Sequence, residues 1–172
     1  MIFILTRPSL TSLRSILGEI TDYVDGKMIG PNQEPVTVEG GGICQIPTTM
    51  FVTSLETGLF VEERTNHSYN TGAYFGDRND SKEFGKDATV YISDSDSEPG
   101  LDLVVRNTYE YPIRFFFQIN GEHLRVDVYG PPELKLYYVE IEGPIMVYPF
   151  AGRLVKDVGR FTRAAKTIVT QH

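Results

Sequence analysis

The chain of 172 residues contains one cysteine, three histidines and no tryptophan. A single cysteine excludes an intramolecular disulfide and any metal site built from several thiolates. Acidic residues outnumber basic residues by 23 to 16, and the net charge of −7 has the wrong sign for a nucleic-acid-binding surface. We therefore expect no nucleic-acid partner, no metal and no cofactor.

A long apolar stretch is also lacking. Residues 1–5 are apolar, but Arg7 and Pro8 follow closely, so the run is too short for a signal-peptide core or a membrane span. No later stretch qualifies either. As written, the sequence predicts neither an export signal nor a transmembrane segment, which would leave the chain cytoplasmic.

Glycine and aromatic residues are plentiful instead: 16 Gly, 10 Tyr and 10 Phe favour many short strands joined by turns. Asn120-Gly121 is the strongest hairpin signal, because a tight hairpin turn needs residues that accept positive φ. The segments that we expect to be strands are residues 36–38, 59–65, 88–92, 101–106, 113–119, 124–129, 134–141 and 145–147.

Two segments have helical spacing. Residues 10–17 predict a short helix capped by Ser9, and residues 44–57 predict a longer one. Pro47 is tolerated only in a first turn, which places the start of the longer helix near Gln45.

The sum of these elements predicts an α+β fold. It is a mainly antiparallel β-sheet with one buried helix that follows the loop Gly-Gly-Gly-Ile-Cys-Gln at residues 40–45. Pro131-Pro132 marks a boundary, so we expect one domain over residues 1–130 and a C-terminal extension over residues 131–172 that packs on it.

The position of Cys44 suggests chemistry. At a helix N-terminus, unpaired N–H groups and the helix dipole favour a thiolate, the nucleophilic form. The amides of Cys44 and Gln45 would point outward and hold an oxyanion, with the Gln45 side chain as a further donor. The glycines up to Gly42 would let a substrate backbone come close.

A nucleophilic thiol also needs a base and a group that orients the base. His67 follows a strand that leaves the cysteine's own helix, whereas His123 lies at a hairpin, so we prefer His67 as the base. Asp87, at the start of a strand, is the preferred orienting group over Asp77 and Asp80 in the preceding loop.

Each of these residues also has a plainer interpretation. A lone cysteine is often a buried hydrophobe. Arg64 can bind a substrate carboxylate, or it can pair with a nearby acidic residue. A metal site formed by Cys44, His67 and His123 is a third arrangement that the residue types allow.

Several strings together resemble the VanW family, which was named for an accessory protein of vancomycin-resistance clusters. The resemblance covers residues 16–130. The strings that carry it are Gly40-Gly41-Gly42-Ile43-Cys44-Gln45, Thr48-Thr49, Glu63-Arg64, His67-Ser68, Asp87-Ala88-Thr89-Val90, Asp102-Leu103, Asn107, Pro112-Ile113 and Tyr129-Gly130. It implies Cys44 as a nucleophile and adds Ser68 to the candidate substrate contacts.

The resemblance also implies a function. Some family members are similar to L,D-transpeptidases, so we expect acyl transfer on peptidoglycan stem peptides with 3→3 cross-linking, and a place in the cell envelope. A cysteine hydrolase with the same residues and a non-catalytic cell-wall-binding domain are the alternatives. One departure from the family is an insertion between Tyr74 and Asp87, which is expected to reshape the acyl-donor site.

Overall fold

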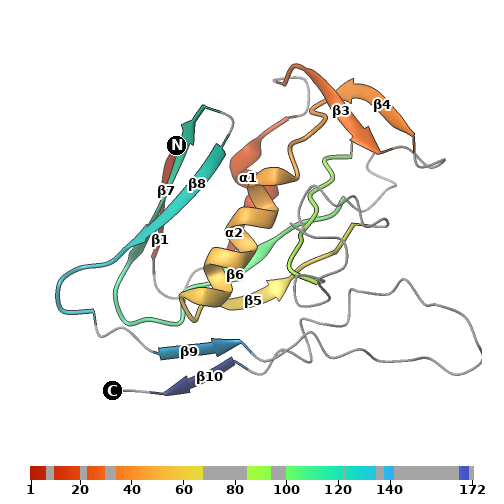
Figure 1. Ribbon diagram of the computed structural model, residues 1–172. Coiled ribbons are helices and arrows are strands. Elements are labelled where there is room, and N and C mark those ends of the chain that lie inside the picture. Colours follow the sequence, from red (N-terminus) through yellow and green to blue (C-terminus); the bar gives the residue numbers. More distant parts are fainter. Residues whose placement is uncertain are drawn as a thin grey trace, which may run out of the picture.

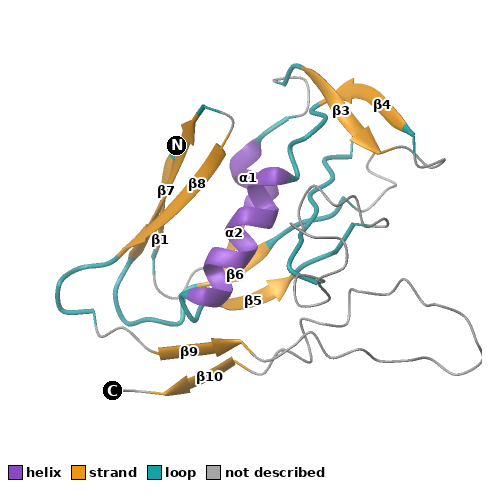
Figure 2. Ribbon diagram, in the orientation of Figure 1, coloured by secondary structure: helices purple, strands orange, loops and turns teal. Residues whose placement is uncertain are grey.

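The computed structural model describes residues 1–6, 10–19, 23–29, 34–67, 85–93, 100–121, 123–134, 138–141 and 167–170. Within these residues every paired strand is antiparallel, so the mainly-β α+β prediction is confirmed (Figures 1 and 2). The elements are β1 (Ile2–Leu5), β2 (Leu10–Ser12), α1 (Leu13–Leu17), β3 (Asp25–Ile29), β4 (Pro35–Glu39), α2 (Gln45–Glu56), β5 (Phe60–Glu63), β6 (Val104–Arg106), β7 (Ile113–Asn120), β8 (His123–Tyr129), β9 (Tyr138–Ile141) and β10 (Thr167–Thr170).

The largest hairpin joins β7 and β8. Side chains on β7 alternate, and Ile113, Phe115 and Phe117 point into the core. The hairpin prediction is confirmed, but the turn begins one residue later than expected, because Asn120 itself pairs with His123. Gly121 takes the positive φ of 61° that the turn requires.

The apolar start of the chain forms β1, a strand that the sequence did not predict. β1 lies against β7, with Ile2 opposite Phe116 and Leu5 opposite Ile113, and completes the sheet β1-β7-β8. Leu5 is fully buried, whereas Ile4 is about half exposed, as expected for alternating faces. The predicted strand over 101–106 shortens to β6, which belongs to a separate sheet, β2-β6-β5.

The predicted first helix was wrong in its first turn. Residues 10–12 form β2, and the helix starts at Leu13 with Ser12 as the cap, whose Oγ accepts from the Ser15 amide. Buried Asp102 fixes this junction, because its carboxylate accepts from the Arg14 amide at 2.9 Å and from the Ser12 hydroxyl. Ser9 lies outside the described residues.

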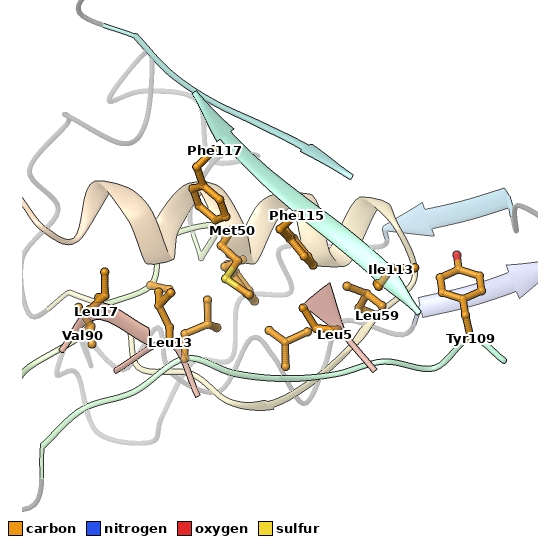
Figure 3. Close-up of a cluster of buried hydrophobic side chains, with 14 residues drawn as sticks. Leu5, Leu13, Leu17, Met50, Leu59, Val90, Tyr109, Ile113, Phe115 and Phe117 are labelled. Carbon is orange, nitrogen blue, oxygen red and sulfur yellow. The ribbon is translucent and has the colours of Figure 1, made fainter. Parts of the chain in front are cut away.

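The core lies beneath α2, between the sheets. Met50 and Phe51 of α2 are buried against side chains from β1, α1, β6 and β7. Figure 3 shows Met50, Phe115 and Leu5 within this cluster. Packing on several elements therefore fixes the position of the helix whose N-terminus carries Cys44.

The described part of the C-terminal extension forms a β9–β10 pair. Leu134 packs against the core, and Val139 lies beside Gly58 at the end of α2. The predicted strand at 145–147 lies outside the described residues, and the domain boundary near 131 remains a prediction. No helix within the described ranges combines the length and the hydropathy needed to cross a bilayer.

Candidate active site

The strand predicted over 88–92 is reduced to a single β-bridge at Tyr91, and segment 87–91 passes beside the N-terminus of α2. The amide of Thr89 donates to the Thr65 carbonyl at 2.7 Å, and Tyr91 exchanges backbone hydrogen bonds with Leu101. On the opposite edge, the Thr48 hydroxyl bonds both the amide and the carbonyl of Ala88, at 3.1 and 2.9 Å. The first turn of α2 therefore takes the place of a neighbouring strand.

Cys44 lies on the same edge, immediately before α2, and is half-buried. Its Sγ lies 3.6 Å from the Val90 carbonyl, to which the thiol donates. Two α2 side chains, Cys44 and Thr48, thus meet alternate residues of the segment. Sequence reasoning did not assign a role to Thr48 or Val90; the four-residue spacing from Cys44 to Thr48 was the available signal.

The amides around the sulfur differ from the prediction. The Gln45 amide is not free, because it donates to the Gly42 carbonyl at 3.1 Å, and the Ile43 amide donates to Gly40. Within the described part of the chain, the N–H groups of Gly42 and Cys44 donate to no acceptor. The amides of Gly42 and Cys44, and not that of Gln45, are therefore the ones left to bind a ligand at this turn.

Glycine is needed in this loop for two reasons. Gly41 lies against Gly26 of β3 so closely that a Cβ on Gly41 would come within 2.2 Å of the Gly26 carbonyl. Gly42 has a φ of +88° and nothing within 4 Å of its Cβ position. The β3–β4 hairpin therefore rests on the loop through backbone contact, at the N-terminal end of α2 (Figure 1).

His67 is fixed by Asp87, as the sequence predicted for an orienting group. His67 Nδ1 and the His67 amide each lie 2.7 Å from Asp87 Oδ2. With Nδ1 bound to the carboxylate, Nε2 is the ring nitrogen left to interact with Cys44, which lies close enough to raise the pKa of His67. The structure therefore brings Cys44, His67 and Asp87 together in one chain of contacts.

The opposite charges of His67 and Asp87 stabilise each other, which shifts the pKa of both groups. Burial alone would lower the pKa of His67, but hydrogen bonds and charge from Asp87 and Cys44 outweigh it and raise the pKa from 6.5 to about 9. Burial would raise the pKa of Asp87, yet the hydrogen bonds from His67 and the charge of Arg64 hold it below its ordinary value. An imidazolium facing an ionised carboxylate is the favoured state at neutral pH.

Arg64 corrects a second expectation. Its side chain is 0% exposed, so it cannot reach a substrate carboxylate in this arrangement. Its Nη2 donates to Asp87 Oδ1 and to the Gly85 carbonyl, both at 3.0 Å, and its Nε donates to the Asp87 carbonyl at 2.6 Å. The guanidinium also lies 5.0 Å from the centre of the Phe51 ring. Arg64 therefore forms a buried ion pair with Asp87. This is the second of the two interpretations given above, pairing with a nearby acidic residue.

The remaining residues that the sequence analysis considered for the site do not lie in this cluster or are not described by the structure. His123 is exposed at the start of β8, a strand of the sheet β1-β7-β8, whereas His67 follows β5 of another sheet; of these two histidines, His67 is the one at Cys44. Ser68, Asp77 and Asp80 lie outside the described residues. Among the residues that the structure does describe, no cluster of three or more His, Cys, Asp or Glu side chains is arranged to hold a metal ion.

Comparisons with known proteins identify the family of the chain. A family model described as "VanW like protein" matches residues 7–129. The chain is 28% identical over 125 residues to the vancomycin B-type resistance protein VanW of Enterococcus faecalis. That alignment covers 73% of this chain and 42% of the relative, so the chain spans less than half of the relative's length. No solved structure matches the chain.

Proposed function

This chain belongs to the VanW family, and we propose that it is a cysteine acyltransferase acting on peptidoglycan stem peptides. The observation that carries the proposal is the chain of contacts from Cys44 through His67 to Asp87, whose Oδ2 lies 2.7 Å from His67 Nδ1. Nucleophile, base and orienting carboxylate in this order are the parts that acyl transfer requires.

In the proposed reaction the Cys44 thiol loses its proton to solvent, and the thiolate, held beside the His67 imidazolium, attacks a peptide carbonyl of the acyl donor. The carbonyl oxygen becomes an oxyanion that the amides of Gly42 and Cys44 can hold, with the exposed Gln45 side chain as a further donor. The His67 imidazolium then donates its proton to the leaving amine of the terminal D-residue, and the acyl group remains on sulfur as a thioester.

The second half of the reaction consumes the thioester. An amine of a neighbouring stem peptide attacks its carbonyl, His67 removes the proton from that amine, and the thiolate of Cys44 is restored as the new amide forms. Water in place of the amine would give hydrolysis by the same residues. Asp87 holds the imidazolium in orientation throughout, and Arg64 holds Asp87.

The partner and location follow from the same proposal. A stem peptide or its precursor is the acyl donor, and the cell wall is where such peptides are linked. The name of the Enterococcus faecalis relative, a vancomycin B-type resistance protein, supports a role in cell-wall modification linked to vancomycin resistance.

The test is intact-mass measurement after incubation with a synthetic stem tetrapeptide ending in D-Ala. We expect an adduct on Cys44 that adds the mass of the peptide minus that of the free D-Ala released, none on Cys44→Ala, and slower formation on His67→Gln. Cross-linked dimers after addition of an amine acceptor would indicate transfer, and shortened monomers would indicate hydrolysis. Wild-type protein that forms no adduct and turns over no peptide would refute the proposal.

A further inference from the structure

The edge of segment 87–91 that faces Cys44 continues past the sulfur. Backbone groups of Ala88 and Val90 point to the α2 side, whereas the Thr89 amide and both backbone groups of Tyr91 are paired on the opposite side. By the same alternation the backbone groups of Ile92 return to the α2 side. One strand edge therefore runs from Thr48, past Cys44, to Ile92.

Beyond Thr48 this edge is almost unpaired. Across the described residues, the Val90 amide donates to no acceptor, and its carbonyl accepts only the Cys44 thiol at 3.6 Å. Neither backbone group of Ile92 is hydrogen-bonded to any described residue. Val90 is only 5% exposed, and a buried N–H without a partner is both costly and rare.

Donors and acceptors that repeat every two residues along an extended segment match another extended backbone. A side chain or a small ion would satisfy one of these groups and leave the others unpaired. A peptide added as a strand would satisfy the Val90 and Ile92 groups together and would lie directly beside the sulfur.

We infer that the Val90–Ile92 edge is the docking site for the backbone of an extended acyl-donor peptide, which binds as an added strand with its reactive carbonyl at Cys44. The inference rests on the proposed function, and it adds how the substrate is held. The donor is recognised by its main chain, so peptides with different side chains are expected to bind.

The chemistry and the docking are linked through Val90. While Cys44 is a thiol, its proton is donated to the Val90 carbonyl. When the thiol loses that proton, the carbonyl becomes free to accept a peptide N–H. Docking and formation of the thiolate therefore favour each other.

Binding can be measured without catalysis by using the Cys44→Ala variant and the stem tetrapeptide as an amide. In an NMR titration we expect the amide resonances of Val90 and Ile92 to move downfield, as new hydrogen bonds form. Analogues methylated singly at each peptide nitrogen should lose affinity at every second position, the signature of strand pairing. Unmoved Val90 and Ile92 resonances, or equal tolerance of methylation at all positions, would overturn the inference.

A variant on the protein side gives an independent measurement. Ile92→Pro removes one edge N–H, and Tyr91 before it is already extended, as a residue preceding proline must be. Because Ile92 also packs against the core, Ile92→Ala is the matched control that loses the side chain and keeps the N–H. We expect Ile92→Pro to raise the peptide Kd by about fivefold over Ile92→Ala; equal values would contradict the edge contact.

The two proposals fail in different ways. Peptide binding with the period-two pattern but no adduct on wild-type Cys44 would refute acyl transfer and leave the docking edge standing. An adduct on Cys44 without that pattern would refute the docking edge and leave acyl transfer standing.

Discussion

At the scale of single residues, Asp87 is the centre of the site. Its Oδ2 accepts from the ring and the amide of His67, and its Oδ1 accepts from Arg64. The sequence predicted Asp87 from its place at a strand start. It could not distinguish the two interpretations of Arg64, because the burial of a guanidinium depends on distant residues such as Phe51 packing over it.

The raised pKa of His67 predicts how stability depends on pH. The folded value of about 9 lies above the ordinary 6.5, so the protonated ring stabilises the folded state fully below pH 6.5. This contribution is lost as pH rises through 9, and its size is about 2–3 kcal/mol. Urea unfolding at pH 6.5 and 9.5 should show that loss in wild type and not in His67→Gln.

The exposed His123 provides the control for this experiment, because it lies at the start of β8 and away from the site. His123→Gln should keep the pH dependence of wild type. A wild-type slope between pH 6.5 and 9.5 that His67→Gln shares in full would show that His67 is not the group responsible.

Arg64 is predicted to stabilise the fold as well as the site. Arg64→Gln removes one of the two cations beside the buried Asp87 carboxylate, which costs about 3–5 kcal/mol of unfolding free energy. Arg64→Lys keeps the charge but cannot make the same three bonds to Asp87 and Gly85, so an intermediate loss is expected. Arg106 is the matched control: its pair with Glu62 is 46% and 34% exposed, so Arg106→Gln should cost about 1 kcal/mol or less. Similar losses for Arg64→Gln and Arg106→Gln in urea unfolding would contradict this role.

At the scale of elements, local signals located α2 well and α1 poorly. Pro47 placed the start of the long helix near Gln45, where α2 begins. The first helix was predicted from residue 10 but begins at Leu13, because Leu10–Ser12 pairs with β6. The sequence contains no local signal for that contact. Tertiary pairing overrode the helical spacing of the apolar residues there.

The loop before α2 gives a prediction about glycine. Gly42→Ala is strained only by its φ of +88°, because nothing lies within 4 Å, so it should cost about 1–2 kcal/mol. Gly41→Ala brings a Cβ within 2.2 Å of the Gly26 backbone and must push the β3–β4 hairpin away, so it should cost more. Thermal unfolding of the two variants checks this order. A Gly41→Ala protein as stable as Gly42→Ala would mean that the hairpin does not rest on the loop.

At the scale of the whole molecule, strands were easier to predict than their partners. Period-two alternation located β7 and β8, and Gly121 marked their turn. Nothing local indicated that residues 2–5 pair with residues 113–116, more than a hundred positions away, or that β6 joins β2 and β5 instead of β7. Cys44, His67 and Asp87 come from three separate segments, so their proximity also depends on the tertiary structure. The only sequence signal for that proximity was the resemblance of the motifs that contain them to the VanW family.

The central claim, that His67 activates Cys44, is tested most directly by the rate at which iodoacetamide alkylates Cys44 between pH 5 and 10. The account predicts that wild-type Cys44 reacts at pH 6.5 at least about tenfold faster than Cys44 in folded His67→Gln, because the imidazolium stabilises the thiolate. Wild type and His67→Gln with the same rate at every pH would contradict it.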